Sequence, residues 1–323
     1  MEWLMKYGGN AEKVPDYDCR SEDRIYGRKD YVLGTIFIAY GIIAEIVYIL
    51  DLTVMAKKQY RRLSCYKIMI VLGVYDMAAL SLNSLLTGYF WFTGGNYCTN
   101  PTFMFVAGAI ALGGALVWSM HDLLCVGHKS SSGPREQSTH ANGSLYFVFF
   151  TPPLLFNSDE SAWFFFTFAK SKANIAGHFL NYPHTANNLF VVVLTCLLYI
   201  QYSRVLLRYS RIGSGLTWTQ KSFFLQCSTI CMANLIAALI YVYMQFLYTP
   251  QSLVIAGHVC WQLGHGFPAI VYLVLNRSIQ TEVLVLLGIR KRSSLKSLTQ
   301  HTASTTRPGN SAEQRVRRNI ICC

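Results

Sequence analysis

Three polar residues of one apolar stretch share a helical face. His258, Gln262 and His265 are spaced four and three residues apart, so they lie along one side of a helix. Such a stripe can contact a ligand, or it can supply hydrogen bonds between neighbouring helices. Imidazole is also a good zinc ligand, but further His or Asp side chains would have to converge and the helical HxxxH spacing is missing. No metal site is therefore expected, and the first two interpretations stay open.

A single charge, Asp76, stands near the middle of the apolar stretch Lys67–Phe92. A carboxylate in hydrocarbon costs roughly 2.5–3.5 kcal/mol, so it must face other helices or a wet cavity. Asp76 is a candidate conformational or sodium-linked switch, because its charged and neutral states prefer different partners, or it is a hydrogen-bonded structural acid. Glu45 is a second switch candidate, and it could instead simply pair with a neighbouring helix.

These polar residues lie in apolar stretches that are long enough to cross a bilayer, which takes about 20 residues. The chain of 323 residues is 52% hydrophobic and only 14% charged. We therefore expect an all-α membrane protein, a bundle of seven transmembrane helices within residues 33–276. The expected spans are Leu33–Met55, Lys67–Phe92, Thr102–Val126, Leu145–Phe156, Asn188–Tyr202 with an extension to Leu207, Phe223–Tyr248 and Leu253–Leu275.

Two parts of this plan depart from seven regular spans. The run Leu145–Phe156 has 12 residues and contains Pro152 and Pro153, so as a helix it reaches only about 18 Å of a core of roughly 30 Å. The fourth helix is therefore expected to be short or defective, and the polar segment Gly127–Ser144 precedes it. After the seventh span, apolar residues at helical spacing predict an amphipathic juxtamembrane helix over 277–292, lying on the membrane surface.

The net charge of +12 is not spread as a stripe that suits nucleic acid. Basic residues gather in short segments beside the apolar stretches. By the positive-inside rule these basic segments are cytoplasmic. Residues 1–32 are then an extracellular N-terminal segment, and 293–323 a disordered basic cytoplasmic tail. The ten cysteines form no CxxC pair. Only Cys19 and Cys98 are expected outside, where they could form one disulfide.

Several motifs, in their order along the chain, resemble the nematode serpentine receptor class T proteins, which are G-protein-coupled-receptor-like chemoreceptors. The resemblance implies a seven-helix receptor that binds a small environmental chemical outside and activates a heterotrimeric G protein inside, with no cofactor. It implies a plasma-membrane protein of sensory cells. The matching stretches include residues 41–48, 64–69, 72–76, 156–158, 181–188 and 264–277.

The resemblance also assigns roles to single residues. Asp76 resembles the buried span-two acid of rhodopsin-like receptors, and Cys98 the cysteine at the outer end of span three. Asp122 stands about where such receptors keep an acid followed by arginine, but Leu123 follows it here, so that switch is absent. The outer loop 157–187 has no cysteine, which leaves Cys19 as the external partner of Cys98. The segment 127–144 does not resemble the family.

A ligand pocket is expected between spans three, five, six and seven. Residues Arg204, Arg208 and Arg211 could contact the G protein, although topology alone would also place them on that side. The rival functions are a membrane-embedded zinc hydrolase using His258 and His265, a transporter, and a non-signalling degenerate receptor. No nucleophile elbow, phosphate-binding loop or carboxylate pair supports an enzyme. The pocket candidates are His258, Gln262, His265, Gln245 and Trp261.

Overall fold

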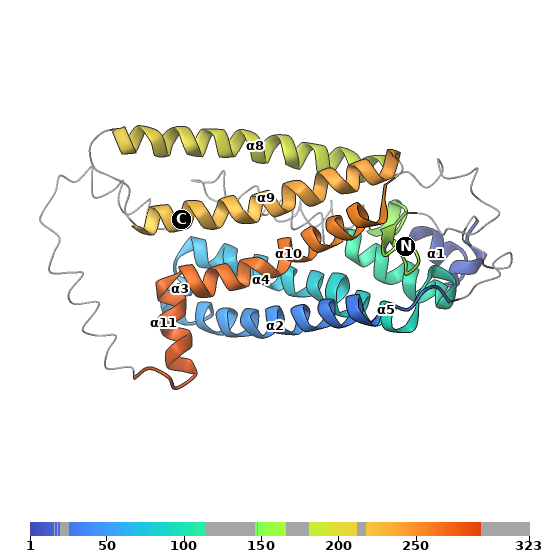
Figure 1. The fold of residues 1–323 in the computed structure, drawn as a ribbon, viewed down its shortest axis with the longest axis horizontal. Coiled ribbons are helices and arrows are strands. Elements are labelled where there is room, and N and C mark those ends of the chain that lie inside the picture. The colour runs from blue at the N-terminus through green and yellow to red at the C-terminus, as the bar shows by residue number, and fades with distance from the viewer. Residues whose placement is uncertain are drawn as a thin grey trace, which may run out of the picture.

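The computed structural model describes residues 1–15, 17, 19, 26–113, 146, 148–165, 181–211, 218–247 and 249–291. It is mostly helical and elongated, and its long helices run lengthwise (Figure 1). Neighbours pack in the order α8, α9, α10, α2 and α4. The helices of this bundle are α2 (Tyr31–Met55), α4 (Ser64–Leu80), α5 (Thr87–Thr93), α8 (Tyr182–Arg211), α9 (Trp218–Phe246) and α10 (Gln251–Leu275).

Helix α2 shows how the sequence forms a two-faced membrane helix. It begins after Asp30, whose side chain accepts a hydrogen bond from the Leu33 backbone N–H at 2.9 Å. One stripe is buried in the bundle, while apolar side chains on the other faces are exposed, as suits contact with lipid. The buried stripe is Gly34, Phe37, Gly41, Ala44, Tyr48, Asp51, Val54 and Met55.

The expected second span forms one continuous helical run, Ser64 to Thr93, with an irregularity in its middle. Between α4 and α5 lies a π-helical turn, η2 (Ser81–Leu86). The run ends at Gly94, which has φ of 70°, a left-handed conformation that glycine adopts without strain. Gly88 faces Gly34 of α2 so closely that a Cβ on Gly88 would lie 2.9 Å from the Gly34 carbonyl oxygen. The missing side chains therefore let these two helices approach closely.

One end of the bundle is closed by short elements. These are α1 (Glu2–Lys6), η1 (Ala11–Lys13), η3 (Tyr97–Thr99), the helix Pro101–Gly113 and a hairpin of β1 (Leu155–Asn157) and β2 (Ala162–Phe164). A disulfide joins Cys19 to Cys98 here. Apolar side chains of the N-terminal segment, the hairpin and the helix ends form one buried cluster, so the N-terminal segment packs as part of the fold.

The expected fourth helix is wrong in its second half. Residues 148–150 are helical, but Leu155–Asn157 is a strand that pairs antiparallel with Ala162–Phe164. The physical reason is Pro152–Pro153, because proline lacks the N–H that a helix needs and disfavours helix in the residue before it. The fold is therefore mostly helical with one small hairpin, not purely helical.

Helix α8 begins six residues before the expected Asn188. The Asn181 side chain accepts a hydrogen bond from the His184 backbone N–H at 2.9 Å and so caps a helix that starts at Tyr182. The second residue of this helix is Pro183. Proline is tolerated in a first helical turn, where its missing N–H would have no partner within the helix. Helix α9 also starts earlier than expected, at Trp218 instead of Phe223.

At the opposite end, α11 (Arg277–Leu286) bends by 86° from α10. Asn276 caps it by accepting hydrogen bonds from the backbone N–H groups of Ser278 and Ile279. The helix occupies part of the expected amphipathic segment 277–292. Figure 1 shows it lying across the end of the bundle.

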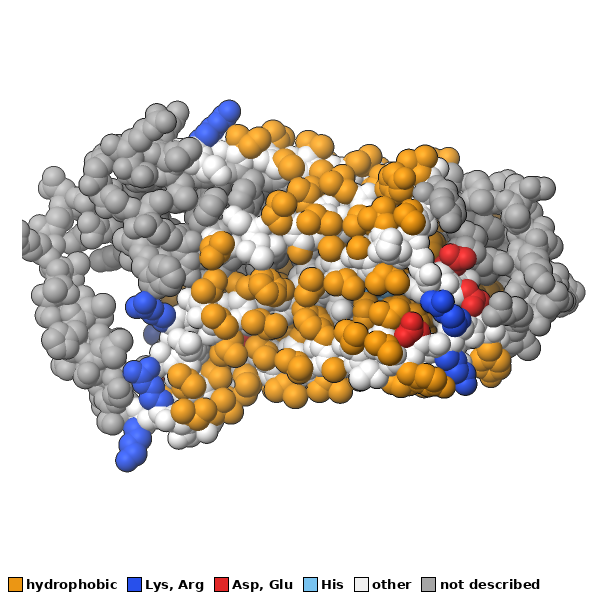
Figure 2. Space-filling view, viewed as in Figure 1, with side chains coloured by type: hydrophobic (Ala, Val, Ile, Leu, Met, Phe, Trp, Pro, Cys, Tyr) orange, Lys and Arg blue, Asp and Glu red, His pale blue; other side chains and the backbone are white. Residues whose placement is uncertain are grey.

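The surface of the bundle has the polarity of a membrane protein. On the face in view, Figure 2 shows a broad apolar band across the middle, Lys and Arg side chains at the α11 end, and acidic together with basic side chains at the hairpin end. Among the described residues, two helices are long and apolar enough to cross a membrane, Tyr31–Met55 and Met69–Thr93, or three if α10 and α11 count as one bent span. Third-span residues after Gly113, Asp122, all of Gly127–Ser144 and the 293–323 tail lie outside the described residues.

Candidate functional site

Helix α10 carries three buried polar side chains on one face, His258, Gln262 and His265. Each contacts the Ser64–Thr93 run. Gln262 and His265 also make hydrogen bonds to residues of α2. We call this set of contacts the polar ladder. Its three rungs follow each other along α10, as the four- and three-residue spacing predicts.

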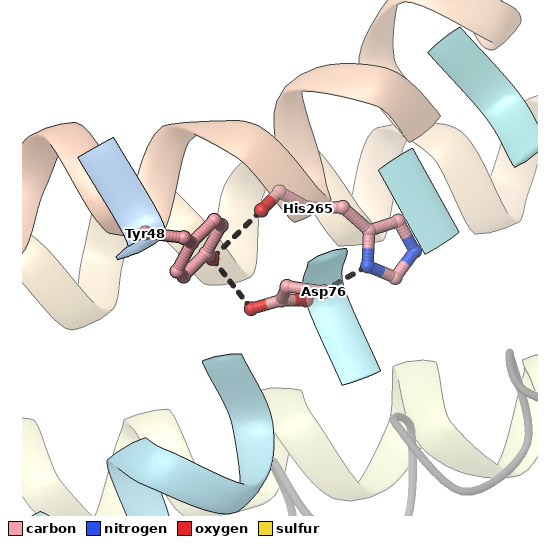
Figure 3. A network of polar contacts seen from close by, with 3 residues as sticks. All are labelled: Tyr48, Asp76 and His265. Atoms are coloured by element: carbon pink, nitrogen blue, oxygen red, sulfur yellow. Dashed lines mark hydrogen bonds and ion pairs between the residues drawn. The ribbon is translucent and has the colours of Figure 1, made fainter. Parts of the chain in front are cut away.

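The first rung joins three helices at Asp76 (Figure 3). His265 Nδ1 lies 2.8 Å from Asp76 Oδ1, and the hydroxyl of Tyr48 lies 2.6 Å from Asp76 Oδ2 and 2.8 Å from the His265 carbonyl oxygen. Asp76 and His265 are both buried, so they form an ion pair when the imidazole is protonated. The carboxylate thus faces the bundle interior, as its cost in hydrocarbon requires.

A proton count limits how this rung can be arranged. The Tyr48 hydroxyl has one proton but lies within hydrogen-bond distance of two acceptors, Asp76 Oδ2 and the His265 carbonyl oxygen. Either a charged Asp76 competes with the carbonyl for that proton, or a protonated Asp76 donates to Tyr48 and Tyr48 donates to the carbonyl. The same heavy-atom positions therefore accept two distributions of protons.

The second rung lies at the π-helical turn. Gln262 Nε2 donates to Ser84 Oγ at 2.6 Å and approaches the Phe37 carbonyl oxygen at 3.4 Å. The Ser84 hydroxyl in turn donates to the same carbonyl. Each buried polar atom of this rung has a partner, which is the usual condition for stable burial.

The third rung depends on the π-helical turn as well. In η2 the Thr87 backbone N–H bonds to Leu82, five residues back, so it does not use the carbonyl of Asn83. His258 Nε2 lies 3.2 Å from that carbonyl oxygen and therefore carries the proton that it donates. The irregular helix thus supplies the acceptor for His258.

The His258 ring is surrounded by aromatic rings. Its centroid lies 5.0 Å from that of Phe37 and 5.6 Å from those of Trp91 and Trp261. Neighbouring polar atoms are unsatisfied: within the described part of the chain, Asn83 Oδ1 and Nδ2 and Trp91 Nε1 have no hydrogen-bond partner, although both side chains are fully buried. Each such atom costs about 1–3 kcal/mol unless a group beyond the described residues bonds to it.

The hairpin covers this third rung. Trp163 Nε1 donates to Thr87 Oγ1 at 2.9 Å, and the Phe156 ring lies 5.6 Å from the ring of Trp91. At the turn between the strands, Ser161 adopts φ of 62° and its hydroxyl accepts a hydrogen bond from Gln251 of α10. The hairpin is therefore fixed to both α5 and α10, and it packs against the ring of Trp91.

Of the other expected site residues, Trp261 packs against the ladder, and the rest lie apart from it or outside the described residues. Glu45 is half-buried and accepts a hydrogen bond from Ser81 at 3.3 Å. Trp261 packs between the rings of His258, His265 and Tyr241. Arg204 is exposed at the far part of α8. The side chains of Arg208, Arg211 and Gln245, and all of Asp122, fall outside the described residues.

A second ion pair holds α11 to the end of α2. Lys57 Nζ donates to Glu282 Oε2, and Gln59 Nε2 approaches the other carboxylate oxygen at 3.4 Å. Burial, with repulsion from the Glu282 carboxylate, raises the pKa of the nearby Tyr60 hydroxyl, so it stays neutral at physiological pH. This contact fixes the direction in which α11 leaves α10.

The sequence alone did not single out Tyr48, Asn83, Ser84 or Trp91 as site residues. Asn83 and Ser84 carry a usable signal, because they are a polar pair inside an apolar stretch that must find partners in the bundle. Tyr48 and Trp91 give no such signal, because both side chains also suit an ordinary lipid-facing or core position.

No group of three metal-ligating side chains exists among the described residues. His258 and His265, the proposed zinc pair, are instead bound to the Asn83 carbonyl and to Asp76. An apolar surface over long helices that are joined by buried polar contacts defines a multi-pass helical membrane protein.

The comparisons with known proteins identify the family. Residues 4–128 and 142–296 match the family described as serpentine type 7TM GPCR chemoreceptor Srt, and the chain belongs to this family. The resemblance found in the sequence is confirmed, and the family is one of receptors, not of enzymes. The chain is also 24% identical over 305 residues to serpentine receptor class T-55 of Caenorhabditis elegans, covering 88% of this chain and 83% of the relative.

The family match is interrupted where the sequence departs from the family pattern. The two matched stretches leave residues 129–141 between them, inside the segment Gly127–Ser144. The match resumes before the hairpin and includes all of α8, α9, α10 and α11. The polar ladder therefore lies entirely within the matched residues.

Proposed function

We propose that this protein is a chemosensory receptor that crosses the membrane seven times, binds a small environmental chemical outside and couples to a heterotrimeric G protein inside. In this orientation the end that carries the hairpin and the disulfide is extracellular, and the α11 end is cytoplasmic. Two charge patterns support it: basic side chains gather at the α11 end, and acidic and basic side chains mix at the hairpin end (Figure 2). The disulfide also suits an oxidising compartment.

The polar ladder carries the proposal. It runs from His258 beneath the hairpin to His265 at Asp76, so ligand contact near the hairpin can bias the contacts of Asp76 deeper in the bundle. Asp76 would act as the switch, because its rung accepts two proton distributions and therefore two sets of preferred partners. The exposed Arg204 on α8, together with Arg208 and Arg211, would face the G protein.

The test is nucleotide exchange on purified G protein by the full-length receptor in lipid nanodiscs. We expect the receptor to promote exchange when it is given a chemical that it binds. Asp76→Asn should change the ligand-dependent part of that rate, because it removes the charged state. Exchange that no binding ligand alters would contradict the proposal.

A non-signalling receptor is the alternative that the interruption at 129–141 favours. Sequencing the transcript across the codons for Met120 to Leu145 separates the two. An additional apolar stretch in the message would support the signalling receptor. A message that encodes 127–144 as written, with protein retained inside the cell, would support the alternative.

A further inference from the structure

The third rung of the ladder contains buried hydrogen-bonding atoms to which no described residue bonds. The side-chain carboxamide of Asn83 has both its oxygen and its nitrogen without partners in the described part of the chain, and there Trp91 has an unpaired indole N–H. Both side chains are fully buried. Both residues contact His258: the Asn83 backbone carbonyl accepts a hydrogen bond from its imidazole, and the Trp91 ring packs against the imidazole. Elsewhere on the ladder, Ser84, Gln262, Asp76 and Tyr48 are all bonded.

The Trp91 ring and the neighbouring His258 ring stand in apolar, aromatic surroundings. The rings of Phe37, Phe156 and Trp261 lie against Trp91 or His258, and none of these described neighbours is charged. A charged group placed here would lose its hydration without gaining a counter-charge. A neutral group would complete the unpaired bonds at much lower cost.

We propose that Asn83 and Trp91 are the hydrogen-bonding groups of a ligand site beneath the hairpin, and that its ligand is a small neutral molecule, largely apolar, with one carbonyl or hydroxyl oxygen. The ligand oxygen accepts from Trp91 Nε1 and Asn83 Nδ2, and a ligand hydroxyl also donates to Asn83 Oδ1. The rings around His258 contact the apolar part. This inference rests on the proposed receptor function and names its ligand class.

The position of the site explains how binding is transmitted. Asn83 lies in the π-helical turn, and its carbonyl accepts from His258. Ser84, the next residue, accepts from Gln262. A ligand held by the Asn83 side chain therefore acts on the turn from which the second and third rungs are built.

The experiment measures the thermal unfolding midpoint of the full-length protein in nanodiscs with five probes of equal chain length. The neutral oxygenated probes are 2-heptanone and 1-heptanol, and the comparison probes are heptane, heptanoate and heptylammonium. We expect the first two to raise the midpoint at lower concentrations than the other three. No shift with either oxygenated probe overturns the ligand class.

Two variants locate the site. Asn83→Leu and Trp91→Phe should each raise the concentration of 2-heptanone needed for half of the shift by about tenfold, the effect of one lost hydrogen bond. Without a probe, Asn83→Leu should leave the midpoint unchanged or raise it, because it removes unsatisfied atoms. A lower midpoint with an unchanged response to 2-heptanone would instead assign Asn83 to a buried water and overturn the site.

Matched controls come from the same fold. Asn234→Leu removes a carboxamide on α9, and Trp163→Phe removes an indole N–H that already donates to Thr87. Both should retain the 2-heptanone response, and loss of it in both would overturn the assignment to Asn83 and Trp91.

Parallel nucleotide-exchange measurements separate this inference from the proposed function. Binding that depends on Asn83 and Trp91 without any exchange upholds the site and contradicts the receptor function. Ligand-promoted exchange that survives both variants upholds the receptor function and overturns the site.

Discussion

The imidazole of His265 lies 2.8 Å from the carboxylate of Asp76, although 189 positions separate them in the chain. Tyr48 bonds to both residues and brings α2 to the same point. Helix α10 therefore cannot move relative to α2 and α4 without breaking or rearranging these contacts. The contacts of this rung therefore couple the positions of the three helices.

Loss of His265 should be strongly destabilising. His265→Ala leaves Asp76 buried without its imidazole partner, and breaking a buried pair in this way costs about 3–5 kcal/mol. Thermal unfolding of the purified protein in nanodiscs measures the effect. In an Asp76→Asn background the same change should cost much less, because no charge is left uncompensated. Equal costs in the two backgrounds would contradict a coupled pair.

Tyr48→Phe should lower stability by about 1–3 kcal/mol, because it removes the hydroxyl that Asp76 and the His265 carbonyl share. Tyr40→Phe is the matched control. Its hydroxyl is buried without a partner among the described residues, so its removal should be neutral or stabilising. Unfolding midpoints of the two variants compare them directly, and equal losses would count against the contacts of Tyr48.

Removal of the disulfide should destabilise the hairpin end. Cys19 and Cys98 are 79 positions apart, and a disulfide typically contributes about 2–4 kcal/mol to stability. Cys19→Ser and Cys98→Ser should therefore have equal effects, and the double variant should be no worse than either. Cys196→Ser, at an exposed free cysteine, should leave the unfolding midpoint unchanged. Additive losses in the double variant would contradict a shared bond.

In the ion pair between Lys57 and Glu282, replacing Lys57 should lower stability more than replacing Glu282. The Lys57 side chain is 33% exposed, whereas that of Glu282 is 6% exposed. Lys57→Met leaves a buried carboxylate uncompensated and should cost about 1–3 kcal/mol. Glu282→Gln leaves a lysine that can reach solvent and should cost less than about 1 kcal/mol. Unfolding midpoints would show the order, and a reversed order would contradict it.

The sequence by itself determined the membrane class, the family and the stripe on α10. Long apolar stretches must be helical in lipid, because every backbone polar group needs a partner there. The same constraint places Asp76 and the polar face of His258, Gln262 and His265 toward other helices. Helical spacing alone then fixes which residues share that face.

Only the tertiary structure decided which groups these polar side chains meet. The π-helical turn Ser81–Leu86 has no marker in the sequence, yet it leaves the Asn83 carbonyl for His258. The hairpin over the third rung likewise replaces an expected helix, because two prolines end the helix and pairing with Ala162–Phe164 depends on the fold around it. Contacts between residues far apart in the chain are set by the packing of whole helices, and local periodicity carries no information about that packing.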